Sequence, residues 1–354
     1  MSAAQSTSPC TLLGETEVLV IGAGLGGVAA AAKLLHAGHE SLVVLEEGDR
    51  IGGVWQVNRY PNVACDTPID LYAYKFFPGD TWTTNFAPGS EIQTYLERVA
   101  GHFGVTPKIS FNTRVVSTVW SEEAGRWLVT ASDGRRWSAR YVVWAGGLFS
   151  QPLLSVTKGA ETFTGLSVHS TAWDDDIDLE GKRVAVVGGG ATSIQIVPYV
   201  QERAEKLIAF VRTPSYVSPR PDIIFSDSER GTPEFVARMA ERRKEWFDRY
   251  EVVTKTRFPM NEKLVREQEA TWKELFDAQV KDPHAREVLT PRYRYGCKRR
   301  CSVACTTLPS PRITSNWWDG ACRTWTATSS LTAWVSGTRW MSSFGRQALT
   351  PSAC

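Results

Sequence analysis

Two glycine-rich segments constrain the fold of this chain most strongly. The first follows the apolar run Val18–Ile21, has glycines at positions 22, 24, 26 and 27, and precedes an alanine-rich stretch. The second follows the run 182–187 and begins Gly188-Gly189-Gly190. A buried strand, a glycine turn and a helix in this order form the phosphate-binding unit of dinucleotide-binding domains. We therefore expect an α/β protein that holds two dinucleotides.

The first unit has the residues that a dinucleotide diphosphate requires. Gly22 permits a tight turn, Gly24 lets the backbone approach a pyrophosphate, and Gly27 lets helix and strand pack closely. The next expected strand, 42–45, ends in Glu46, where a carboxylate accepts a hydrogen bond from a ribose hydroxyl. An acid here disfavours a 2′-phosphate, so FAD or NAD is favoured over NADP. The alternative is a glycine-rich turn beside a surface acid.

The second unit differs from the first at its third glycine and at the end of its second strand. It keeps Gly188 and Gly190 and continues with Thr192, but Ser193 stands where the third glycine would be. The next expected strand ends in Arg212, a cation that suits the 2′-phosphate of NADP. The alternative is a solvated surface arginine. The acid in one unit and the base in the other favour FAD in the first site and NADPH in the second.

Composition excludes several other classes of protein. The net charge of +2 provides no attraction to nucleic acid or an anionic membrane, and no run of 18 apolar residues suggests a membrane span. Seven cysteines without a Cys-x-x-Cys pair argue against a metal site or a redox dithiol and favour a cytoplasmic location. Residues 1–17 lack the pattern of a signal peptide and are expected to form a disordered lead-in.

The segment between the two units resembles the fingerprint of Baeyer–Villiger monooxygenases, a branch of the flavin-containing monooxygenases. Phe163, Gly165, His169, Trp173 and Asp174 match each fixed position of the pattern Phe-x-Gly-x-x-x-His-x-x-x-Trp-Asp. Further matches are Gly52, Gly53 and Trp55, the run Asn58 to Pro61, Asp66, and Arg212-Thr213-Pro214. The resemblance runs from about residue 18 to residue 299.

The resemblance implies an α/β fold with two doubly wound Rossmann-like domains, and with it a domain plan. Residues 18–155 would form the N-terminal part of an FAD domain, and 156–299 an NADP domain with a helical insertion at about 225–290. The charged, aromatic composition of the insertion region fits this plan, and equally fits a solvated pair of helices. Residues 300–354 would be a poorly ordered tail outside the family, which leaves the FAD domain incomplete.

The resemblance also implies a reaction and its residues. The family uses FAD and NADPH to insert one oxygen atom from O2 next to a ketone carbonyl, which gives an ester or lactone, so the partners are a small ketone and O2. Arg299 and Asp66 are the implied catalytic residues, although without the family Arg299 reads as part of a surface basic pair. His169 would link NADP binding to domain movement, or be only a structural histidine. The implied FAD contacts are Gly22, Gly24, Gly27, Glu46, Gly53, Trp55, Asp66, Tyr72 and Val115, and the implied NADP contacts are Gly188, Gly190, Thr192, Ser193, Arg212, Thr213 and Lys298.

The tail has an unusual composition. From position 300 it contains no Lys or Glu, one Asp, and 18 Ser or Thr among 55 residues. Such a composition suits neither a packed α/β segment nor an acidic disordered tail, and a frameshift after about Arg299 is the hypothesis it favours. The alternatives to an active enzyme of this type are a flavin monooxygenase that oxygenates nitrogen or sulfur, and an inactive dinucleotide-binding remnant.

Overall fold

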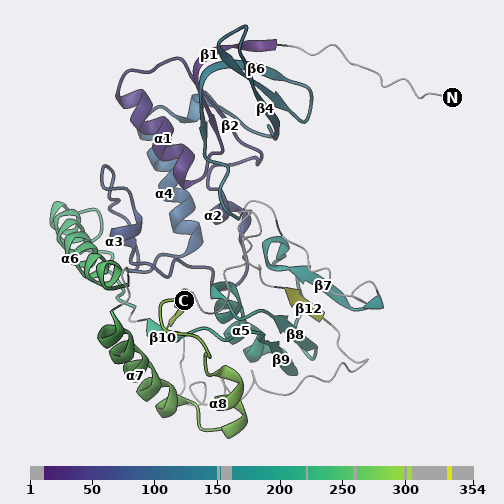
Figure 1. Cartoon of the computed structure of the whole chain (residues 1–354), viewed down its shortest axis with the longest axis vertical. Helices are drawn as coiled ribbons and strands as arrows, with labels where there is room; N and C mark the ends of the chain where they lie inside the picture. The colour runs from purple at the N-terminus through teal and green to yellow at the C-terminus, as the bar shows by residue number, and fades with distance from the viewer. Residues whose placement is uncertain are drawn as a thin grey trace. The chain divides into compact units, whose positions relative to one another are not determined.

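A computed structural model describes two compact units of the chain (Figure 1). The described residues are 12–149, 152, 162–220, 222–257, 261–298, 301–304 and 333–336. The first unit comprises Met1–Val57 and Gly89–Gln151, and the second Asn58–Pro88 and Pro152–Cys354. The division differs from the expected boundary at 155, because residues 58–88 cluster with the second unit.

The first unit is built on a six-stranded sheet with the order β3-β2-β1-β6-β5-β4. The strands are β1 (Leu12–Ile21), β2 (Leu42–Leu45), β3 (Ile109–Ser110), β4 (Val115–Ser121), β5 (Arg126–Ala131) and β6 (Arg136–Trp144). The helices are α1 (Leu25–His36), α2 (Val54–Val57) and α4 (Gly89–His102). β3, β2, β1 and β6 are parallel, whereas β5 and β4 pair antiparallel to their neighbours. The carboxyl end of β1 leads directly into the first glycine turn.

β1 begins earlier than the sequence indicated. The expected lead-in, 1–17, is wrong for residues 12–17, which belong to β1 and pair with β6, while residues 1–11 lie outside the described residues. Thr16 is buried, and its hydroxyl donates to the Ser41 carbonyl at 2.9 Å. The Arg126 guanidinium donates to the Thr16 carbonyl at 2.7 Å. Residues 12–17 have no apolar pattern of their own, so their place in β1 depends on pairing with residues that are distant in the sequence.

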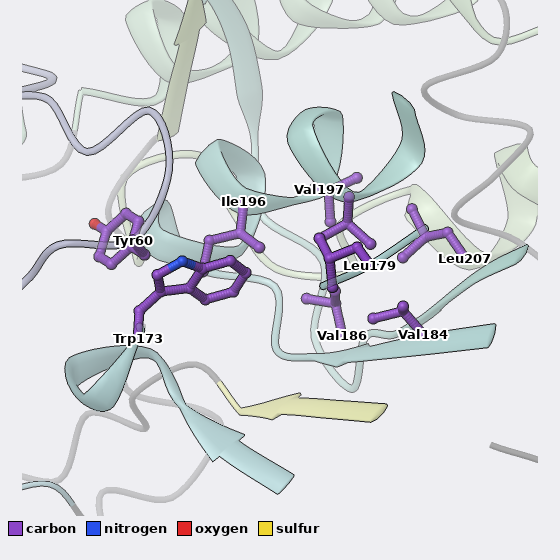
Figure 2. Packing of buried hydrophobic residues seen from close by; sticks show 9 residues of the cluster. Tyr60, Trp173, Leu179, Val184, Val186, Ile196, Val197 and Leu207 are labelled. Carbon is purple, nitrogen blue, oxygen red and sulfur yellow. The ribbon is translucent and has the colours of Figure 1, made fainter. Parts of the chain in front are cut away.

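The second unit contains a four-stranded parallel sheet with the order β7-β12-β8-β9. Its elements are β7 (Leu166–His169), β8 (Arg183–Val187), β9 (Lys206–Phe210), β12 (Ala333–Ser336), and the helices α3 (Ile69–Tyr72) and α5 (Ala191–Arg203). Figure 2 shows the core between α5 and this sheet, in which Val184 and Val186 lie beneath Val197. A pair of parallel strands, β10 (Val217–Arg220) and β11 (Cys301–Ala304), forms a second sheet.

Three helices occupy the range of the expected insertion. They are α6 (Pro233–Arg257), α7 (Glu262–Gln279) and α8 (Pro283–Leu289). The Asn261 side chain caps α7 by accepting from the Leu264 N–H at 3.1 Å, and Asp282 caps α8 in the same way. Trp272 and Tyr216 pack edge to face at 4.9 Å in a shared core. The α7 and α8 part of the region is therefore anchored to β10 by a shared core.

The tail contains two short strands that the sequence did not indicate. β11 pairs with β10, and β12 pairs with both β7 and β8. The expectation of a poorly ordered tail is wrong for these eight residues, 301–304 and 333–336. Trp and Val at 334 and 335 are residue types that favour strands. Arg299 and the rest of the tail lie outside the described residues.

Candidate dinucleotide-binding sites

The first glycine turn is closed so tightly at Gly22 and Gly27 that neither position has room for a side chain. Gly22 has φ +101°, and a Cβ there would lie 2.5 Å from the Ala145 carbonyl oxygen. At Gly27 a Cβ would lie only 1.8 Å from the Gly22 carbonyl oxygen. A close approach of α1 to β1 thus depends on Gly27, as the sequence pattern predicts.

A second glycine lies against the start of α1. Gly53 has φ +56°, and a Cβ there would lie 2.9 Å from the Gly24 Cα. Gly24 is the N-cap of α1, with no side-chain cap and no acidic residue in the first turn. Backbone N–H groups at such a helix start favour an anion. The cradle fits the diphosphate of FAD, and Trp55 follows it, half-buried in α2.

Glu46 contacts the backbone of both loops around the first turn. Its Oε2 accepts from the Ala23 N–H at 2.5 Å, and its Oε1 accepts from the Gly48 N–H at 2.8 Å. A carboxylate has about four acceptor positions, so a ribose hydroxyl can still donate to it. The sequence did not indicate this bridging role. Val115, another expected FAD contact, is half-buried at the start of β4.

The second glycine turn is open at the position where a phosphate would approach. A Cβ at Gly190 would meet nothing within 4 Å, whereas one at Gly189 would lie 2.7 Å from the Val211 side chain. Gly190 is the N-cap of α5, which also lacks a side-chain cap and an acidic first turn. Ser193 is only 4% exposed, so it occupies the packed position that Gly27 holds in the first turn. These residues fit the diphosphate of NADP.

The start of α5 is tied to the segment that contains Asp66. The Tyr60 hydroxyl donates to the Gln195 side chain at 3.2 Å, and the Gln195 amide donates to the Ala64 carbonyl at 3.0 Å. The pKa of Tyr60 is raised, mainly by burial. A hydrogen bond with Thr192 opposes this shift, and the charge of Asp66 adds to it. Tyr60 and Gln195 therefore act as positioning residues, a role that the sequence did not indicate. The match of residues 58–61 to the family pattern is the sequence feature that could have indicated Tyr60.

Arg212 lines a cavity in the second unit. It is exposed two residues beyond the end of β9, and no carboxylate among the described residues pairs with it. The cavity has a volume of about 530 Å³. The residues that line it are Arg212, Thr213, Pro214, Glu287, Val288, Thr290, Arg292 and Tyr293. Beside it, the Lys298 ammonium donates to the Thr213 carbonyl at 2.9 Å. The pKa of Lys298 is lowered, mainly by burial. The electrostatic influence of Cys301 opposes this shift, and that of Arg212 adds to it.

The fingerprint segment contributes its tryptophan to the core and its histidine to the end of β7. Trp173 is 8% exposed, and Figure 2 shows its indole beside Tyr60 and Ile196. His169 is equally buried, and its Nδ1 accepts from the Thr171 N–H at 3.2 Å. The proton of the neutral ring is therefore on Nε2, which is buried without a hydrogen-bond partner among the described residues. Burial lowers the pKa of His169, which favours this neutral form.

The remaining expected site residues lie in the second unit or outside the described residues. Asp66 and Tyr72, expected to contact FAD, are half-buried and belong to the second unit. Lys298 belongs to the same unit, and Arg299 lies outside the described residues. Within the described part of the chain, no cluster of three His, Cys, Asp or Glu could hold a metal ion. No described helix is long and apolar enough to cross a membrane.

Comparison with known proteins agrees with this geometry. A family model described as flavin-binding monooxygenase-like matches residues 15–234, more than half of the chain. The chain is 41% identical over 288 residues to a Baeyer-Villiger monooxygenase of Streptomyces coelicolor, a match that covers 80% of this chain and 55% of the relative. It is 35% identical over 305 residues to one of Pseudomonas aeruginosa, with coverage of 84% and 57%. The chain thus spans about half the length of these curated relatives.

A solved structure supports the fold. Oxidized steroid monooxygenase bound to NADP superposes with a TM-score of 0.77 at 30% identity, over 92% of this chain and 71% of that one. The expectation of two Rossmann-like domains is confirmed by this likeness, together with the parallel strands β3, β2, β1 and β6 of the first unit and the parallel sheet of the second. The chain belongs to the flavin-binding monooxygenase-like family, and the relatives that it resembles are Baeyer-Villiger monooxygenases.

Proposed function

We propose that this chain derives from an FAD- and NADPH-dependent Baeyer–Villiger monooxygenase, which inserts one oxygen atom from O2 next to a ketone carbonyl to give an ester or lactone. One observation carries the proposal. Two similar glycine turns are followed by side chains of opposite charge, Glu46 in the first unit and Arg212 in the second. This contrast suits two different dinucleotides in one chain.

FAD is the proposed ligand of the first unit. Gly22, Gly24 and Gly27 would receive its diphosphate at the start of α1, Glu46 would accept from its ribose, and Gly53, Trp55 and Val115 would line its path. The family match to flavin-binding proteins supports this choice. Bound FAD, once reduced, supplies the activation of O2 that amino-acid side chains cannot provide.

NADP(H) is the proposed ligand of the second unit. Gly188 and Gly190, with the backbone of Thr192 and Ser193, would bind its diphosphate. Arg212, Thr213 and Lys298 would surround its 2′-phosphate. The structural relative bound to NADP supports this choice. The unpartnered Nε2–H of His169 is a donor that domain movement could bring to an acceptor.

Asp66 and Arg299 are proposed as the residues closest to the reaction. A guanidinium stabilises negative charge that develops on oxygen, and a neighbouring aspartate holds it in place by paired hydrogen bonds. Tyr72 would contact FAD near them. The influence of Asp66 on Tyr60 supports its place beside the start of α5. The relatives' names do not favour the alternatives, nitrogen or sulfur oxygenation and an inactive remnant. Cys65, Cys297 and Cys301 are thiols outside any disulfide among the described residues, which suits a cytoplasmic location.

An absorbance scan of the purified full chain tests the proposal. Because FAD retention is expected to be weak, we expect a weak flavin spectrum that bleaches on addition of NADPH and returns in air. Product analysis with a ketone, an amine and a sulfide then identifies the reaction, and only the ketone should be oxygenated. Binding of NADP without a flavin spectrum would instead establish a remnant.

The frame of the tail can be tested separately. We propose that the reading frame changes after about codon 299, which would weaken FAD retention and turnover. Sequencing of the source DNA across codons 298–354 decides this. An intact frame with no family-like sequence in either other frame contradicts it.

A further inference from the structure

We propose that Arg292 is a second guanidinium for the 2′-phosphate of NADP and that Glu287 opposes it, so that the balance of these two residues sets the preference for a 2′-phosphate. The inference rests on the proposed function of the second unit. It concerns residues outside the glycine turn and outside the segment after β9.

The cavity beside Arg212 has two walls. The segment after β9 provides Arg212, Thr213 and Pro214, and α8 with the loop after it provides the others, Arg292 and Glu287 among them. The volume of about 530 Å³ lies within the ordinary range of small-molecule sites. A phosphorylated ribose held by Arg212 would therefore be faced by α8 and its loop.

Arg292 has no counter-ion, whereas Arg294 has one. Arg292 and Arg212 are both exposed at the cavity, and neither pairs with a carboxylate within the described ranges. Arg294, two residues further, donates from both terminal nitrogens to the carboxylate of Glu262. Two unpaired guanidinium groups around one cavity favour an anion between them, and guanidinium binds phosphate in a bidentate manner.

Glu287 supplies the opposite charge to the same cavity. Its side chain is exposed in the last turn of α8, and no described cation is paired with it. A carboxylate in the cavity repels a phosphate and so reduces the affinity that the two arginines provide. Removal of Glu287 should therefore raise the preference for a 2′-phosphate, and removal of Arg292 should lower it.

Titration calorimetry on the full-length chain with 2′,5′-ADP and 5′-AMP tests the inference, because only the first ligand carries a 2′-phosphate. The ratio of the two dissociation constants measures the preference. Arg292→Gln should lower the preference roughly tenfold, and Glu287→Gln should raise it roughly threefold. Arg294→Gln is the matched control and should leave it unchanged, with thermal melting as the check on folding.

Arg212→Gln separates the inference from the function on which it rests. If Arg212→Gln lowers the preference and Arg292→Gln does not, Arg292 is no phosphate ligand while the NADP site stands. An equal loss in Arg292→Gln and Arg294→Gln, or a loss in Glu287→Gln, also overturns the inference. If the wild-type chain shows no preference and Arg212→Gln changes nothing, the NADP site itself is wrong, and the inference with it.

Discussion

Two adjacent glycines at the start of α1 should respond in opposite ways to the same substitution. Gly26→Ala places a methyl group at an exposed position, 3.8 Å from the Ala145 side chain, which is an ordinary contact. It should stabilise α1 by up to about 1 kcal/mol through helix propensity. Gly27→Ala has the same propensity gain, but its methyl would lie 1.8 Å from the Gly22 carbonyl oxygen. Helix and turn would have to separate by more than about 1 Å.

The difference between the two variants isolates this contact. Overpacking of a core costs about 1–3 kcal/mol, and the upper end applies here because the obstacle is backbone. We expect α1 to be about 3 kcal/mol less stable in Gly27→Ala than in Gly26→Ala. Hydrogen–deuterium exchange of peptides from α1 measures the difference, with peptides from α5 as the internal reference. Equal protection of α1 in both variants would refute the packing argument.

Three further predictions concern single side chains. Trp173→Ala should lower the unfolding free energy of the second unit by about 3–5 kcal/mol in urea titrations, whereas Trp144→Ala, at a side chain 68% exposed, should have little effect. Burial lowers the pKa of His169 below 6.5, so the stability it contributes is present above pH 6.5 and is lost as the pH falls through the lower folded value. Melting curves between about pH 8 and pH 5 should therefore vary less with pH in His169→Gln than in the wild type. Glu46→Gln leaves one good acceptor for two backbone N–H groups and should cost about 1.5–3 kcal/mol by exchange of α1 peptides, while its exposed neighbour Glu47→Gln should be neutral.

Local chemistry explains which elements could be predicted from the sequence. The apolar runs before the glycine turns became β1 and β8, because strand, turn and helix are specified within about 20 consecutive residues. Residues 12–17 could not be predicted, since their pairing with β6 depends on residues more than 100 positions away. β12 was missed for the same reason, because its partners β7 and β8 lie far earlier in the chain.

In the candidate site, too, features set by nearby residues could be predicted, and features set by distant residues could not. The need for glycine at position 27 follows from its spacing, and the contact with Gly22 accounts for it. The two bonds of Glu46 to backbone N–H groups could not be read from the sequence, because they require the folded positions of Ala23 and Gly48. The cavity wall that contains Arg292 was also missed, since only the fold brings α8 and its loop to the segment after β9.

The two glycine turns show how one local motif can serve different ligands. In the first, the charged residue after the second strand is already bonded to two backbone N–H groups, so it helps to hold the turn whether or not a ribose is present. In the second, Arg212 makes no ion pair among the described residues, and the cavity that it lines contains a second unpaired arginine and a single carboxylate, that of Glu287. A folded chain gains little from gathering like charges without an anion. The uncompensated charge of the second turn is therefore better explained by a ligand than by stability, which is why Arg212 and Arg292 are the residues to test first.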